Sequence, residues 1–113
     1  MNTRETGSHY EQMAADHLTG MGYEIITMNY LCKNGEIDII ARDGNTLVFC
    51  EVKYRSSSRY GLPEEAVDYR KQAKIRKSAA YYMYSNKYSD SIMVRFDVIA
   101  FLNNHITHIK DAF

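Results

Sequence analysis

The chain has 113 residues, of which 45% are hydrophobic, and it contains 14 basic and 14 acidic residues. This length suits one domain, residues 1–113, with a single core. The sequence lacks the roughly 18 consecutive apolar residues that span a membrane, and its first residues lack the apolar segment of a signal peptide. The two cysteines form no Cys-x-x-Cys motif and suggest no disulfide framework. We therefore expect a cytoplasmic protein that does not contact a membrane.

The zero net charge hides an uneven distribution. Residues 1–51 contain three Lys or Arg against eight Asp or Glu, a net charge of −5, whereas residues 52–77 contain eight against three, a net charge of +5. A concentrated basic segment suits a phosphate backbone. Taken one by one, the same charges are explained as well by a solvated helix face.

The first predicted element is a helix over residues 9–20. Its apolar residues recur at helical spacing, Ser8 can cap the first turn, and a glycine marks the end. Glu11 lies at the edge of the apolar stripe, where a carboxylate in the first turn simply favours the helix dipole. A strand over residues 23–30 follows, and its polar residues place it at or near a sheet edge.

Two β-rich runs, residues 36–42 and 47–54, flank the turn signal Asp43-Gly44-Asn45 and predict a hairpin. Both runs are mostly Ile, Val, Leu and Phe, as expected of strands covered on both faces. Charges are seldom buried unless they are paired or bound to metal. Three charged residues nevertheless interrupt this apolar background: Asp38, Glu51 and Lys53.

The register of the hairpin decides whether the two acids share a face. If the loop is residues 44–45, Asp38 falls opposite Glu51, and if it is residues 43–44, Glu51 becomes a diagonal neighbour on the same face. A three-residue loop would send the two acids to opposite faces. Lys53 follows Glu51 by two residues and shares its face. Either two-residue loop therefore places two carboxylates and one lysine on one surface.

These three side chains have the chemistry of phosphodiester hydrolysis. Two adjacent carboxylates repel, and one takes a proton unless a counter-charge is present. A hard divalent cation such as Mg²⁺ is held by one or two carboxylates, by waters and by substrate phosphate. A lysine beside the metal can orient or deprotonate water and neutralise charge that develops on a phosphate. The alternative is a salt bridge from Lys53 to Asp38 or Glu51 on a half-exposed sheet face.

Residues 54–63 follow as a polar, basic surface loop that borders the three charged residues. Arg55 and Arg59 can contact phosphate from such a loop, although loops of this composition are also often merely mobile. Pro63 then opens a long predicted helix, from about Glu64 to Tyr84.

Lys71 lies inside the apolar stripe of this helix. Its ammonium group either snorkels to solvent or reaches the acidic residues or a bound phosphate. Lys74 faces outward, as ordinary surface charge or as a backbone contact. The run of residues 81–84, Tyr-Tyr-Met-Tyr, fits packing at the helix end or contact between two copies better than a platform for base stacking.

The last predicted elements are strands over residues 92–102 and 105–109, joined by an Asn-Asn turn. Asp97 lies between apolar residues of the first of these strands, and we expect it to be structural and to pair with Arg95 or a helix lysine. The predicted order is α-β-β-β-α-β-β, an α/β domain with a mixed central sheet flanked by helices.

The charged residues of the hairpin and their flanking sequence resemble the motifs of a known protein family. Asp38, with Glu51-Val52-Lys53 on the next strand, resembles the signature of the PD-(D/E)XK nuclease superfamily. The longer strings GEIDIIA (35–41) and FCEVKYR (49–55) resemble more specifically a bacterial family of small endonuclease-like proteins related to archaeal Holliday-junction resolvases. The resemblance extends over about residues 7–100.

This resemblance implies a restriction-endonuclease-like core and a nuclease that uses Mg²⁺ or Mn²⁺ to cleave DNA, including branched or junction DNA. It implies that Asp38 and Glu51 bind metal and that Lys53 activates water. In the resembling family a glutamate of the first helix points into the acidic cluster, which makes Glu11 a third candidate ligand. A helical lysine at the position of Lys71 is expected to support the phosphate.

The family commonly carries an arginine near Leu31, and here Lys33 could replace it. Junction resolvases act as dimers, and the tyrosine-rich run would suit a homodimer. Two other readings remain: a nucleic-acid-binding module with little catalysis inside a larger DNA- or RNA-processing assembly, and a structural protein whose charges form only salt bridges. The candidate nucleic-acid-binding residues are Lys33, Arg55, Arg59, Lys71 and Lys74.

Overall fold

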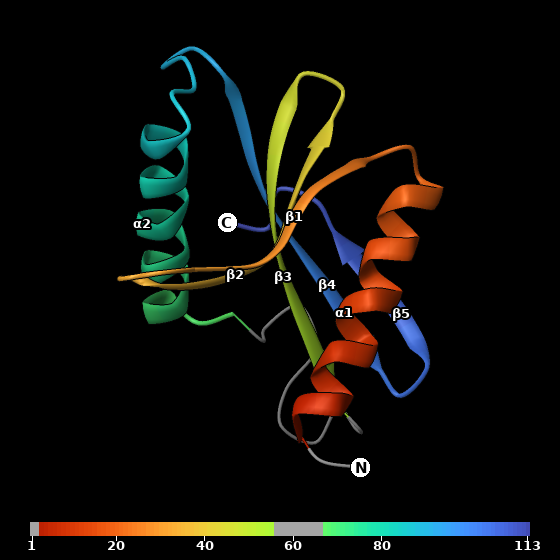
Figure 1. Cartoon of the computed structure of the whole chain (residues 1–113). Helices are drawn as coiled ribbons and strands as arrows, with labels where there is room; N and C mark the ends of the chain where they lie inside the picture. Colours follow the sequence, from red (N-terminus) through yellow and green to blue (C-terminus); the bar gives the residue numbers. More distant parts are fainter. Residues whose placement is uncertain (1–2, 56–66) are drawn as a thin grey trace.

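The computed structural model describes residues 3–55 and 67–113. The predicted α/β class and the order α-β-β-β-α-β-β are confirmed (Figure 1). Within the described residues, neither helix is long and apolar enough to cross a membrane. The elements are α1 (Thr3–Gly20), β1 (Glu24–Cys32), β2 (Gly35–Asp43), β3 (Thr46–Arg55), α2 (Tyr69–Ser85), β4 (Met93–Leu102) and β5 (His105–Ile109).

The five strands form one mixed sheet in the order β1-β2-β3-β4-β5. β3 and β4 are parallel, and the other three neighbouring pairs are antiparallel. Two neighbouring parallel strands need a long connection, and the connection from β3 to β4 contains α2. α1 covers one face of the sheet and α2 the other (Figure 1). β1 lies at a sheet edge, as predicted.

Each face of the sheet has its own apolar cluster. On the α1 face, Ala14 and Leu18 pack against a cluster that includes Ile39, Val48 and Phe101. Because strand side chains alternate between faces, the neighbouring residues point the other way. On the α2 face, a second cluster contains the helix residues Ala79 and Tyr82 and the strand residues Ile40, Leu47 and Phe49.

The first two-residue register predicted for the β2–β3 hairpin is confirmed. Asp43 pairs with Thr46 across a Gly44-Asn45 loop, where Gly44 has a φ of 61°. A positive φ costs glycine nothing, because it has no Cβ. Continued regularly, this register would set Asp38 opposite Glu51, but regular pairing stops one residue earlier, at Ile39 and Cys50.

β2 changes its alternation around Asp38. Ile39 belongs to the α1 cluster, whereas both Ile37 and Ile40 belong to the α2 cluster. The regular β1–β2 register likewise omits Asp38, and Asn29 on β1 has a φ of 55° there. Beyond this point the β1–β2 hairpin turns away from β3 toward α2 (Figure 1). Asp38 therefore marks the fork where β2 leaves β3.

The predicted start of the second helix was wrong. α2 begins at Tyr69, because Asp68 has extended backbone and its carboxylate accepts a hydrogen bond from the Lys71 amide at 2.9 Å. This is the geometry of an N-cap. The predicted opening at Pro63 and Glu64 lies outside the described residues.

Candidate functional site

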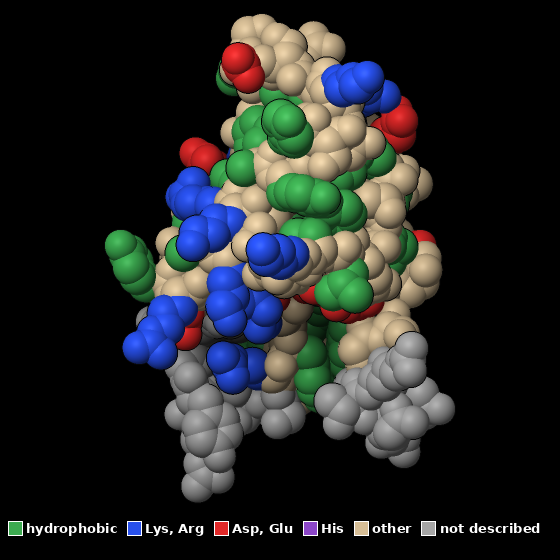
Figure 2. All heavy atoms as spheres, turned by 60° about the vertical axis from the view of Figure 1, so that its left-hand side comes forward, with side chains coloured by type: hydrophobic (Ala, Val, Ile, Leu, Met, Phe, Trp, Pro, Cys, Tyr) green, Lys and Arg blue, Asp and Glu red, His purple; other side chains and the backbone are tan. Residues whose placement is uncertain are grey.

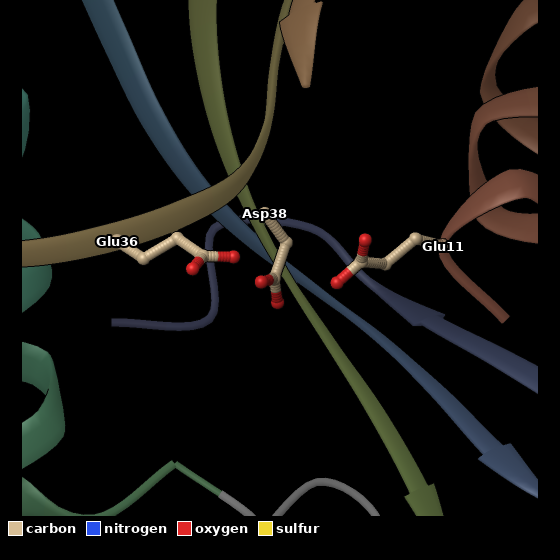
Figure 3. Close-up of side chains that lie close together, drawn as sticks. All are labelled: Glu11, Glu36 and Asp38. Atoms are coloured by element: carbon tan, nitrogen blue, oxygen red, sulfur yellow. The ribbon is translucent and has the colours of Figure 1, made fainter. Parts of the chain in front are cut away.

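Three carboxylates converge where α1 passes over the fork in β2. Glu36 and Asp38 are two residues apart on β2, and Glu11 reaches toward them from α1 (Figure 3). One oxygen from each lies within 4.8 Å of the others. The elements come from distant parts of the sequence, so the cluster exists only because α1 docks on the sheet.

Asp38 lies in an environment that disfavours its ionised form. Burial, and after it the negative charge of Glu51, raise the pKa of its carboxyl to about 7. A hydrogen bond from the Val52 amide, at 2.8 Å from Oδ2, acts in the opposite direction. That amide lies at the fork, so the Asp38 side chain supplies an acceptor where the β2–β3 pairing has ended.

The same electrostatic environment affects Glu11. Burial raises the pKa of its carboxyl, the charges of Glu36 and Glu51 raise it as well, and a hydrogen bond with Asn29 lowers it. Clustered carboxylates without a counter-charge disfavour full ionisation. A cation between them would reverse this effect.

A second group, one carboxylate and two lysines, lies beside the three acids. Glu51 on β3 is 4% exposed, and its Oε1 lies 3.4 Å from Lys53 Nζ and 3.3 Å from Lys71 Nζ. Lys53 shares the strand face of Glu51, and α2 brings Lys71 from its first turn. Two orientations were predicted for Lys71, toward solvent or toward the acidic residues, and its ammonium group takes the second.

The three acids have the donor chemistry of a hard divalent cation. Mg²⁺, Mn²⁺ and Ca²⁺ prefer carboxylate oxygen ligands, and here three such groups meet without a basic partner among the described residues. The cluster also borders a pocket of about 470 Å³, so that water and a ligand could reach it. The pocket is lined by Gly7, Ser8, Glu11, Asn29, Leu31 and Glu36.

The structure groups the acids differently from the sequence prediction. Glu11 and Asp38 lie together as expected, but the third member of their cluster is Glu36, whereas Glu51 is occupied by the two lysines. Glu36 was not among the residues predicted from the sequence. Its spacing of two residues from Asp38 on a predicted strand was the available signal.

The predicted nucleic-acid-binding residues are spread around these groups. Lys71 contacts Glu51, Lys74 is exposed on α2, and Lys33 is exposed in the β1–β2 turn. Arg55 ends β3, and its buried Nε has no hydrogen-bond partner among the described residues. Arg59 lies outside the described residues.

Comparison with known proteins places the chain in a family. The model of a family described as "Uncharacterised protein family UPF0102" matches residues 10–101 of this chain. A UPF0102 protein of Lachnoclostridium phytofermentans is 45% identical over 113 residues, covering 100% of this chain and 96% of the relative. A UPF0102 protein from Syntrophus aciditrophicus is 51% identical over 112 residues, which cover 96% of this chain and 87% of the relative. Another, from Vibrio cholerae, is 46% identical over 115 residues, which cover 99% of this chain and 94% of the relative. The chain therefore belongs to the UPF0102 family.

Proposed function

We propose that this protein is a divalent-cation-dependent nuclease that hydrolyses phosphodiester bonds in DNA. The observation that carries the proposal is the convergence of Glu11, Glu36 and Asp38 within 4.8 Å beside a buried glutamate that holds two lysines. The resemblance of Asp38 and Glu51-Val52-Lys53 to the PD-(D/E)XK signature supports the same activity.

Glu11, Glu36 and Asp38 would hold the cation, which fits the oxygen donors and the mutual repulsion of the three carboxylates. A bound Mg²⁺ or Mn²⁺ ion would supply Lewis acidity toward a phosphoryl oxygen and make a nearby water more acidic. Asp38 would be ionised in that state, so cation binding is expected to release protons below about pH 7.

Glu51 is proposed to position the two lysines. Its single carboxylate lies against two ammonium groups, which leaves one excess positive charge facing the phosphate. Lys53 would orient the attacking water and stabilise charge that develops on the phosphate. Lys71 would hold a non-bridging phosphate oxygen from the side of α2.

The expected substrate is DNA, including branched or junction DNA, and the expected location is the cytoplasm. Lys33, Arg55, Lys74 and Arg59 are proposed to contact the phosphate backbone. A homodimer would suit a junction with two-fold symmetry.

The proposal is tested with fluorescent duplex, single-stranded and four-way-junction DNA in Mg²⁺, Mn²⁺ or EDTA. We expect cleavage of at least one substrate with metal and none in EDTA. Lys53→Ala should lower the cleavage rate on the order of 10²–10³-fold, as does the loss of one charge-stabilising donor in other enzymes. Lys110→Ala, at an exposed lysine that follows β5, is the matched control and should cleave normally.

Binding without cleavage in every metal condition would reject the nuclease. That result would favour the alternative, a nucleic-acid-binding module that acts within a larger assembly. Cleavage that persists in Lys53→Ala would reject the role of this lysine.

A further inference from the structure

The outward face of α2 carries a row of five long side chains. Arg70, Lys74, Lys77, Tyr81 and Tyr84 recur at alternating spacings of four and three residues, so they lie along one side of the helix. All five are exposed. We call this row the α2 stripe. It begins beside Lys71, which contacts Glu51, and at 1.5 Å per residue it extends for roughly 20 Å along the helix.

The basic end of the stripe is not explained by the stability of the helix. α2, with the sequence YRKQAKIRKSAAYYMYS, contains five Lys or Arg and no Asp or Glu. Arg70 and Lys71 lie in the first turn, where the helix dipole disfavours cations. Among the described residues, the three cations of the stripe form no salt bridge. A row of cations that are not paired with an acid of the described part of the chain attracts a polyanion.

The aromatic end of the stripe does not pack against the core. Tyr81 is 52% exposed and Tyr84 is 84% exposed, whereas Tyr82 between them is buried at 6%. The run of tyrosines that was expected to pack at the helix end therefore divides into one packing residue and two solvent-facing rings. Figure 2 shows Lys and Arg side chains over the lower part of this face and hydrophobic side chains, the class that includes Tyr, above them. Two exposed rings on one side of a helix offer flat surfaces on which unpaired bases can stack.

A pocket of about 610 Å³ opens beside the aromatic end of the stripe. This volume lies within the usual range of small-ligand sites. Its lining combines apolar and aromatic groups with a cation and an acid, which suits a flat heteroaromatic base attached to a phosphate. The lining includes Met83, Tyr84, Lys87, Tyr88, Asp90 and Ile92.

We propose that the α2 stripe binds a single-stranded segment of the DNA substrate. Its phosphates lie along the three cations, its unpaired bases stack on Tyr81 and Tyr84, and the last of these bases enters the pocket. Bases within a duplex are already stacked and paired, so only unpaired bases can offer their faces to the two rings. This inference rests on the proposed function. It adds that the preferred substrate carries an unpaired extension next to the bond that is cleaved.

The test measures affinity by fluorescence anisotropy in EDTA, so that no cleavage interferes. The probes are a labelled oligo(dT) of about 20 nucleotides and a blunt duplex of the same length; 4–16 nucleotides commonly occupy one single-strand-binding fold. The double variant Tyr81→Ala/Tyr84→Ala should bind the single strand about tenfold or more weakly, as expected for the loss of two stacked bases. Its duplex affinity should change less than about twofold, because the duplex does not use the rings.

Two further variants separate stacking from general surface effects. Tyr84→Phe keeps the ring and should retain single-strand affinity. Tyr69→Ala is the matched control, because Tyr69 is on the same helix and 85% exposed but lies outside the stripe. It should bind both probes as the wild type does.

Unchanged single-strand affinity in the double variant would overturn the inference. Equal losses for the single strand and the duplex would overturn it too. A change of solution mass from dimer to monomer, with single-strand affinity retained, would assign the rings to contact between copies instead. If the wild type cleaves DNA but the double variant binds the single strand normally, only the role of the α2 stripe is rejected. If the double variant binds the single strand more weakly but the wild type cleaves nothing, only the nuclease activity is rejected.

Discussion

At the scale of single residues, the electrostatics of the candidate site depend most on Asp38. It lies at the fork between β2 and β3, where regular strand pairing has stopped and one amide, that of Val52, donates to its side chain at 2.8 Å. Burial and the charge of Glu51 raise the pKa of its carboxyl to about 7. An ionised Asp38 is therefore unfavourable in the metal-free fold.

This raised pKa predicts how stability depends on pH. Folded Asp38 holds its proton up to about pH 7, whereas in the unfolded chain it ionises near 3.8, so stability should fall as pH rises between these values. Asp38→Asn stays neutral and keeps an acceptor for Val52. In EDTA at pH 8, denaturant unfolding should show this variant more stable than the wild type by roughly 1–4 kcal/mol, a difference that shrinks toward pH 4.

Asp90→Asn, at an exposed position, is the control and should show no such pH-dependent difference. If Asp38→Asn is instead less stable than the wild type at pH 8, Asp38 acts as a salt-bridge partner, and the structural reading of the charged residues gains support.

At the scale of elements, a polar network holds β4 and β5 against α1. Asp97 on β4 is 0% exposed, and its carboxylate accepts hydrogen bonds from Arg95 Nε at 2.8 Å, His108 Nε2 at 2.8 Å and the Asp111 amide at 3.1 Å. His108 on β5 in turn contacts His17 of α1 at 3.2 Å. The predicted pairing of Asp97 with Arg95 is confirmed.

Breaking this network should destabilise the fold strongly. Burial works against ionisation of Asp97, but the hydrogen bonds from His108, Arg95 and Asp111 outweigh it and keep the pKa below its ordinary value of 3.8. Its stabilising effect is therefore present at neutral pH and lost only in acid, as pH falls below about 4. Asp97→Asn should cost roughly 3–5 kcal/mol of unfolding free energy at pH 7.

The matched control for that measurement is Asp43→Asn. Asp43 bonds the same arginine, at 3.0 Å from Nη1, but its side chain is 38% exposed, so its loss should cost about 1 kcal/mol or less. Equal losses in the two variants, by urea unfolding at pH 7, would show that burial of Asp97 does not strengthen its contribution.

At the scale of the whole molecule, the candidate site combines residues from the sheet and from the helices on both of its faces. Glu11 comes from α1, Glu36 and Asp38 from β2, Glu51 and Lys53 from β3, and Lys71 from α2. A ligand that bridges such elements stabilises the folded chain, because the unfolded chain cannot assemble the site.

Divalent cations should therefore raise the melting temperature. With a dissociation constant on the order of 1 mM, 10 mM Mg²⁺ would add about 1.4 kcal/mol, which corresponds to a rise of several degrees for a chain of this size. Glu36→Gln removes one proposed ligand and should abolish most of this rise in a calorimetric scan.

Glu24→Gln is the control for the cation measurement. Glu24 forms a solvent-exposed salt bridge with Arg42 and does not belong to the cluster of three acids, so its substitution should leave the Mg²⁺-dependent rise unchanged. A rise of the same size in Glu36→Gln would exclude Glu36 as a ligand.

Local sequence patterns determined much of the fold. Two apolar runs around the turn signal Asp43-Gly44-Asn45 predicted the β2–β3 hairpin, and the structure selected its register, with Gly44-Asn45 as the loop. The same patterns placed Glu51 and Lys53 on one strand face. Helical spacing placed Lys71 on the inner side of α2, where it reaches Glu51.

Only the tertiary structure decided which charged groups meet. Glu36 shares a strand with Asp38 at a spacing of two residues, but Glu11 meets them only because α1 docks on the sheet. That contact joins parts of the chain that are distant in sequence and leaves no short-range signal. The exposure of Tyr81 and Tyr84 beside the buried Tyr82 was likewise fixed by how α2 docks on the sheet. Periodicity shows which residues share a face, but the partner of that face comes from parts of the chain that are distant in sequence.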